Sequence, residues 1–291
     1  MPSYPSDMKI SGWRPPHVIL PGVPLVQFVM RSVLLCGCIL FFSARAQAIE
    51  GLPGSTWGTV TDSFHGNGPA LGEGGMGWIN QGIDWVTLPG GITFDTYAEY
   101  RYRHRAHHKE YYDSWGPALG FEFKISFLRL GMDYYWQKYP SWPGGVQRSN
   151  NREYYLTGYY QWDLNKLSGI NTSSVGGFPG SIWFNLTNDA SGLTGSGAQG
   201  WINQGIDWTT LPGGIIFNTF AEYRFRERTK QFQYFDAQGP AVGLEFKKSA
   251  FRLGLDYYWE SDPELQGNRN FGYYELYLTW YVDWNLKKPA P

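Results

Sequence analysis

Apolar and polar residues alternate along several stretches of about ten residues in this chain. In residues 92–103, Phe94 and Tyr100 fall on one face, and Glu99 and Arg101 fall on the other. A period of two is the signature of a β-strand, because a helix would scatter the charged residues around its circumference. The pattern therefore predicts strands with one apolar face and one charged face.

The clearest of these stretches occurs twice. Residues Trp78–Trp85 return unchanged as Trp201–Trp208, and most positions from Trp78 to Arg105 match a partner 123 residues later. A repeat this long, present in two copies, indicates two halves of one object rather than a solenoid.

Each half contains six alternating stretches, which predicts twelve strands. The first strand of each half has the weakest pattern, so ten strands remain an alternative. The strands are expected near residues 56–64, 78–85, 92–103, 119–124, 128–136 and 156–164, and again near 182–188, 201–208, 215–226, 242–247, 251–259 and 278–286.

Long and short connections alternate along the chain, and the Gly-rich stretch 72–77 is expected to be part of a flexible long loop. Outer-membrane barrels combine long extracellular loops with short periplasmic turns. A soluble β-sandwich is the alternative, but strands of about ten residues with Trp and Tyr at their ends favour a membrane barrel. The fold class predicted is all-β: a closed antiparallel transmembrane β-barrel of about twelve strands. It would consist of repeat 1 at about 54–165, a linker at 166–180 and repeat 2 at about 181–287.

The N-terminal 48 residues have the features of a secretory signal peptide. Arg31 precedes the apolar run 33–42, and cleavage is expected after Ala48. The run is too short for an anchoring helix, and the residues before Met30 fit no targeting pattern and are interpreted as a spurious extension. A single barrel domain, residues 49–291, would then lie in the outer membrane of a Gram-negative cell, with long loops extracellular and both termini periplasmic.

Composition agrees with this class. Aromatic residues make up 18% of the chain and charged residues 17%, and the net charge of -1 argues against nucleic-acid binding. The two cysteines, Cys36 and Cys38, precede the expected mature chain, so no disulfide is expected in the barrel.

Charged residues on the inward face would form two basic ladders on opposite walls of the lumen. Such ladders could guide carboxylate- or phosphate-bearing solutes. The expected selectivity residues are Asp84, Glu99, Arg101, Arg103, Arg105 and Arg129, with their partners Asp207, Glu222, Arg224, Arg226, Arg228 and Arg252. In general layout this resembles the narrow twelve-stranded porins that take up acidic oligosaccharides, which implies an anionic or oligosaccharide solute. The alternative is a lumen closed by arginines and acids that neutralise one another.

Three functions follow from the pattern. The first is a porin-like channel for small or linear polar solutes, anionic ones included, and no enzymatic activity or cofactor is expected. The second is a non-conducting structural or docking barrel of an export or surface-assembly system. The third is a lipid-modifying enzyme that uses Asp62, Ser63 and His65, although neighbours in sequence are a poor signal for a triad. The cluster of His104, His107 and His108 is interpreted as a solvated rim rather than a metal site.

Expected partners are outer-membrane lipids and the barrel-assembly machinery. The final stretch, 278–286, alternates apolar residues and resembles the C-terminal insertion signal of outer-membrane proteins, although it ends on Leu286 and five residues follow it.

Overall fold

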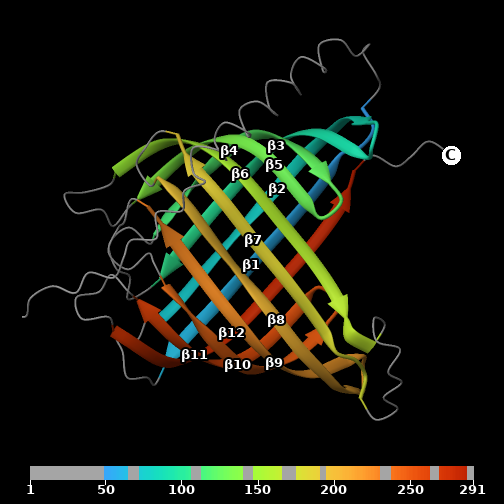
Figure 1. Ribbon diagram of the computed structural model, residues 1–291, viewed down its shortest axis with the longest axis vertical. Helices are drawn as coiled ribbons and strands as arrows, with labels where there is room; N and C mark the ends of the chain where they lie inside the picture. The colour runs from blue at the N-terminus through green and yellow to red at the C-terminus, as the bar shows by residue number, and fades with distance from the viewer. Residues whose placement is uncertain are drawn as a thin grey trace, which may run out of the picture.

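Twelve strands form one closed antiparallel barrel in the computed structural model (Figure 1). The structure describes residues 49–64, 72–105, 113–139, 147–165, 175–190, 195–229, 237–262 and 269–286. The strands are β1 (Pro53–Phe64), β2 (Gly72–Leu88), β3 (Ile92–Arg105), β4 (Ser114–Ile125), β5 (Leu128–Tyr139), β6 (Gln147–Asp163), β7 (Pro179–Asp189), β8 (Ser196–Leu211), β9 (Ile215–Arg228), β10 (Ala237–Lys248), β11 (Phe251–Asp262) and β12 (Arg269–Asn285). Each strand pairs with its neighbours in the chain, and β1 pairs with β12. The predicted fold class is confirmed, with twelve strands rather than ten.

Several strands are longer than the alternation alone predicted. Strand β2 begins at Gly72, so the expectation of a flexible loop at 72–77 is wrong. Glycine has a low strand propensity because it has no side chain to pack, but its backbone N–H and C=O groups pair as well as any other. The predicted signal peptide, residues 1–48, lies outside the described residues. Within those residues no helix is long and apolar enough to cross a membrane.

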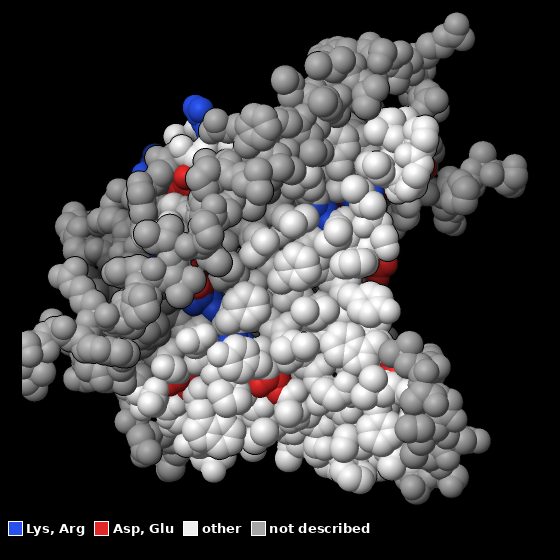
Figure 2. Space-filling view, in the orientation of Figure 1, with Lys and Arg blue, Asp and Glu red and all other residues white. Residues whose placement is uncertain are grey.

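The outer wall is apolar and the inner wall carries the charges. Large apolar side chains are exposed on the outside, including Ile79 at 54%, Leu119 at 53% and Phe251 at 53%. In Figure 2, most of the described part of the outer surface is uncharged, and its charged residues appear in small patches. By contrast, Asp95 and Glu122 point inward and are buried. This distribution inverts that of a soluble barrel and is typical of a barrel surrounded by hydrocarbon.

The repeated stretch fixes the start of each half. The Gln81 side chain donates Nε2–H to the carbonyl oxygens of Leu52 (3.1 Å) and Pro53 (2.9 Å), and accepts a hydrogen bond from Trp284 Nε1 (2.9 Å). Gln204 makes the same bonds to Phe178, Pro179 and Trp162. Gln81 therefore ties the residues at the start of β1 to β2 and to β12. In the same way, Gln204 ties the residues at the start of β7 to β8 and to β6.

The second Trp of each copy occupies a β-bulge. The pairing of β2 with β3 shifts register between Asp84 and Val86, and that of β8 with β9 shifts between Asp207 and Thr209. Trp85 and Trp208 are the extra residues, and each donates its indole N–H to a threonine hydroxyl at 2.8 Å. A bulge strengthens the local twist of a strand, so the repeated stretch bends both halves in the same way.

The seam where the chain closes is equivalent to the seam between the halves. In the β1–β12 pair, Trp57 lies opposite Tyr281 and Gly54 opposite Trp284. In the β6–β7 pair, Trp183 lies opposite Tyr159 in the same way, and Gly180 lies opposite Trp162. The edge strands of the two halves therefore pair with each other in the same way at both seams.

The two-residue turns at the short-turn end of the barrel allow a mutational test of the fold. Ser126 and Ser249 open the two-residue turns that join β4 to β5 and β10 to β11, and their φ angles are 53° and 52°. A side chain is strained at positive φ, and glycine is not. We expect Ser126→Gly to raise the free energy of unfolding by about 0.5–1 kcal/mol, measured by urea unfolding in lipid vesicles. Ser249→Gly is the equivalent change in the second half. A lower free energy of unfolding in both variants would contradict the strained, positive-φ conformation of these two serines.

Candidate functional site in the lumen

Arg101 lies at the centre of a cluster on the inner wall of the first half. Its guanidinium group pairs with Glu99 on β3, Asp133 on β5 and Glu153 on β6, the last at 3.3 Å. It also lies over the Tyr135 ring, 5.1 Å from the ring centroid. One cation therefore holds three carboxylates from three strands. This set is called the Arg101 cluster.

The second half contains the same arrangement around Arg224. Its guanidinium group pairs with Glu222 at 2.5 Å, with Asp256, and with Glu275 at 3.6 Å. The Tyr258 ring lies beneath it, at 5.1 Å from the guanidinium carbon. This set is the Arg224 cluster. Because β9–β12 lie six strands from β3–β6 in the closed barrel, the two clusters face each other across the lumen.

Small residues on the strand between the partners let these side chains lie flat along the wall. Ala118 on β4 is fully buried beneath the bonds from β3 to β5. The Tyr97 ring covers Gly120, where a Cβ atom would be 2.6 Å from the ring, and the Tyr155 ring covers Gly131 at 2.4 Å. Larger residues would push the rings and the arginine towards the barrel axis. Arg101 and Arg224 keep 27% and 26% of their side chains exposed, although both face inward.

A lysine forms the next layer, closer to the short turns. In the first half, Lys124 Nζ lies 2.8 Å from Asp84 Oδ1 and 3.0 Å from Asp95 Oδ2. Asp84 and Asp95 face each other across β2 and β3. The lysine therefore relieves the repulsion between two carboxylates that the fold brings together.

The lysine layer of the second half has one fewer charge. Lys247 Nζ lies 2.5 Å from Asp207, and Asn218 occupies the position that corresponds to Asp95. The Asn218 amide donates a hydrogen bond of 2.7 Å to Asp207. An amide replaces a carboxylate here, so the lumen is not symmetric in charge.

Arg129 and Arg252 face the lumen near the short-turn end and are its more exposed arginines. Their side chains are 48% and 46% exposed, and they approach Glu122 at 3.3 Å and Glu245 at 3.8 Å. Solvent reaches both groups, so these pairs are screened and weak.

The arginines nearer the long loops link the two halves. Arg228 Nη2 lies 3.9 Å from Glu153, which also binds Arg101, so Glu153 connects β9 to the Arg101 cluster. Arg103 and Arg226 lie on the same inward face by strand alternation. Both also have partners.

The structure thus places the predicted selectivity residues on the inner wall but joins them to acids. Glu99 with Arg101, and Glu222 with Arg224, form the two clusters, and Arg105 belongs to β3 although its side chain lies outside the described residues. The same alternation places Asp133 and its repeat partner Asp256 on the lumen face, as the structure shows. The prediction missed Glu153 and Glu275, although both are in phase with inward tyrosines on β6 and β12.

Carboxylates outnumber cations in both clusters. Asp133 and Asp256 are fully buried, and in each the Oδ1 atom lacks a hydrogen-bond partner among the described residues. No group of His, Cys, Asp or Glu among the described residues has the geometry of a metal site. By its own members, each cluster therefore has more carboxylates than cations and a negative formal charge.

Asp62 and Ser63 do not face each other as the sequence-based triad requires. Asp62 and Ser63 are neighbours on β1, so their side chains point to opposite faces. Ser63 Oγ donates to Glu275 Oε2 at 3.3 Å, and Asp62 is exposed on the outside. His65 lies outside the described residues. Of the predicted rim histidines, His104 approaches Asp113 at 2.9 Å, and His107 and His108 lie outside the described residues.

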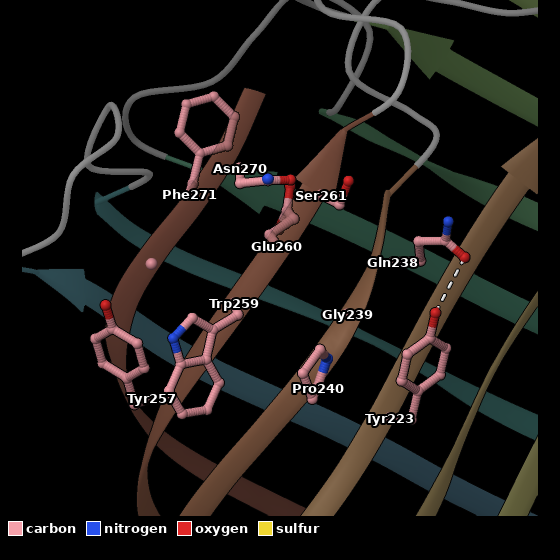
Figure 3. A pocket seen from close by; sticks show the side chains of 11 residues that line it. Tyr223, Gln238, Gly239, Pro240, Tyr257, Trp259, Glu260, Ser261, Asn270 and Phe271 are labelled. Atoms are coloured by element: carbon pink, nitrogen blue, oxygen red, sulfur yellow. Dashed lines mark hydrogen bonds between the residues drawn. The ribbon is translucent and has the colours of Figure 1, made fainter. Parts of the chain in front are cut away.

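A groove of about 530 Å³ opens at the long-loop end of β9–β12 (Figure 3). Tyr257 and Trp259 form an aromatic wall, with ring centroids 4.6 Å apart. Ser261 and Asn270 supply uncharged polar groups at its upper edge. Because outward and inward residues alternate, the groove lies on the outside of the barrel and not in the lumen.

No protein-family model matches this chain, and no curated protein matches its sequence. Similar solved structures include the beta domain of the Bordetella autotransporter BrkA, with 12% identity, covering 79% of this chain and 98% of that one, at a TM-score of 0.33. LpxR from Salmonella typhimurium has 13% identity over 78% and 99% of the two chains, at 0.37. The KdgM porin has 11% identity over 78% and 98%, at 0.31.

These three are bacterial outer-membrane β-barrels, the general class that the strand pattern predicts. TM-scores this low identify neither a family nor an activity. The function therefore has to come from the residues of this chain.

The Arg101 cluster is expected to contribute to the stability of the barrel. Removing one partner of a buried charge group leaves the others unpaired, so we expect Arg101→Met to lower the free energy of unfolding by about 3 kcal/mol. Arg129→Met is the matched control, because Arg129 is about half exposed and should cost less than about 1 kcal/mol. Urea unfolding of both variants in lipid vesicles measures the difference. Equal losses would contradict the central role of Arg101.

Proposed function

We propose that this protein is an outer-membrane channel for small polar solutes and that its lumen prefers cations. The apolar outer wall, the inward charges and the alternation of long loops with short turns support a barrel that spans a bilayer. By the layout of known outer-membrane barrels, the long loops would be extracellular and both termini periplasmic.

The observation that carries the proposal is the ratio of three carboxylates to one guanidinium group in each wall cluster. The arginines of the predicted ladders are engaged in these pairs. An anion entering the lumen would meet excess carboxylates rather than a basic track. The proposed preference for cations is therefore the opposite of the preference for anions expected from the sequence.

The position of the clusters supports an open path rather than a plug. Their side chains extend along the wall over Ala118, Gly120 and Gly131. Arg101 remains partly accessible, and Arg129 is about half exposed. Ion pairs that cross the axis would bury these groups more completely. Mutual neutralisation and conduction are therefore compatible in this barrel.

Planar-bilayer recording tests the proposal. We expect single-channel currents, and in a tenfold KCl gradient a reversal potential displaced towards that of K⁺. In the double variant Glu99→Gln with Glu222→Gln, the K⁺/Cl⁻ permeability ratio should fall about fivefold, the Boltzmann factor for ~1 kcal/mol of unit-charge interaction at 4 Å in water. Glutamine keeps the side-chain shape and one acceptor oxygen for the arginine and removes the charge; its NH2 group replaces the oxygen that accepts from Asn80 or Asn203.

The control is Asp62→Asn, which removes a carboxylate from the outer wall and should leave selectivity unchanged. A chloride-selective wild type would overturn the proposed sign. The absence of current from folded protein would overturn conduction itself and favour the non-conducting structural barrel.

A further inference from the structure

Three basic residues form a strip on the outer wall at the long-loop end of β5 and β6. Lys138, Arg148 and Arg152 are all exposed, and Lys138 lies directly opposite Arg148 in the strand pairing. Arg152 is four residues further along the same face of β6, about 13 Å away at the usual rise per residue. These residues are called the basic strip.

The charge of the basic strip is not compensated by the described part of the protein. Like charges directly opposite each other on paired strands are destabilising. Within the described residues, no carboxylate forms an ion pair with any of the three. The outward residues paired directly with the strip are uncharged, apart from the strip itself. Asp113, two residues before Trp115, pairs with His104 at 2.9 Å, and residues 140–146 include no acidic residue. Their outward neighbours on the paired strands are Trp115, Tyr134, Trp136, Asn150 and Asn188.

The basic strip lies next to aromatic residues that mark a depth in a membrane. Tyr134 and Trp136 contact each other edge to face at 4.7 Å, and Trp136 is 40% exposed. Further from the loops, the wall becomes apolar at Leu119. Tyr and Trp concentrate where hydrocarbon meets headgroups. Residues on the loop side of this pair therefore lie at headgroup level, where arginine forks bind phosphate oxygens.

The duplication provides a comparison within the same molecule. The second half keeps the aromatic pair as Tyr257 and Trp259, at 4.6 Å. The positions of the basic strip are occupied there by Ser261, Asn270 and Tyr274, and two of these line the groove in Figure 3. The barrel wall therefore folds without basic residues at these positions. The strip is confined to β5 and β6.

We propose that the basic strip binds the phosphorylated headgroup of a lipid in the leaflet that surrounds the long-loop end. This inference rests on the membrane location proposed above and not on conduction. Each basic residue near a headgroup phosphate is worth about 1 kcal/mol, so the strip should strengthen phospholipid retention on the order of 100-fold.

Native mass spectrometry of the full chain in detergent micelles tests the proposal, with dioleoyl phosphatidic acid as probe and dioleoylglycerol as its uncharged counterpart. The wild type should retain phosphatidic acid on the order of 100-fold more strongly than the triple variant Lys138→Ser, Arg148→Asn, Arg152→Tyr, which copies the second half. The reciprocal variant, Ser261→Lys, Asn270→Arg, Tyr274→Arg, should gain a second bound lipid. High salt should weaken the retention of phosphatidic acid by the wild type and by the reciprocal variant.

Three results would overturn the proposal: equal retention of the two lipids by the wild type, equal retention by wild type and triple variant, or complete displacement by millimolar inorganic phosphate, which would identify a site for free anions. Urea unfolding shows whether each variant is folded. If the triple variant does not fold, the reciprocal variant alone decides, and no gain in lipid would refute the site. Conductance of the same samples separates this inference from the proposed function, because lipid binding without current leaves the strip intact and refutes only conduction.

Discussion

Closure of the sheet is the constraint on which the other features depend. A closed barrel has no free strand edge, and every backbone group within the wall can pair with a neighbouring strand. Because side chains alternate, each strand must place half of them inside and half outside. Hydrophobic residues occupy the outer positions, and charged residues collect in a narrow interior. Those charges are stable only where they find partners, as Arg101 and Arg224 do.

Glycine determines how the interior is filled. Aromatic rings on one strand lie over glycines on the next, as Tyr97 does over Gly120 and Tyr277 over Gly254. The chain thus combines residues with poor strand propensity and large rings into one flat layer. The same gaps give the arginines a route along the wall to carboxylates two and three strands away. Glycine richness, which alone suggests flexible loops, here belongs in part to the paired strands of the wall.

The sequence predicted the architecture well and the lumen only in outline. Strand number, alternation and the inward face follow from local period-two patterns, which need no knowledge of contacts. The ion pairs do not, because Arg101 and Glu153 are 52 residues apart and meet only when the four strands β3–β6 have paired. Whether these arginines can attract an anion depends on their ion pairs, which a count of arginines on one strand does not include. The stretch beginning at Gly72 was misjudged because pairing outweighs propensity.

The equivalent seams have a consequence for how the barrel closes. A six-stranded chain with the edges of β1 and β6 has two free rims that fit those of an identical chain, since β12 meets β1 as β6 meets β7. Alone it exposes both rims, and a pair of copies covers them. When both halves belong to one chain, their meeting is an intramolecular step rather than an encounter between molecules. A single chain therefore closes at any dilution.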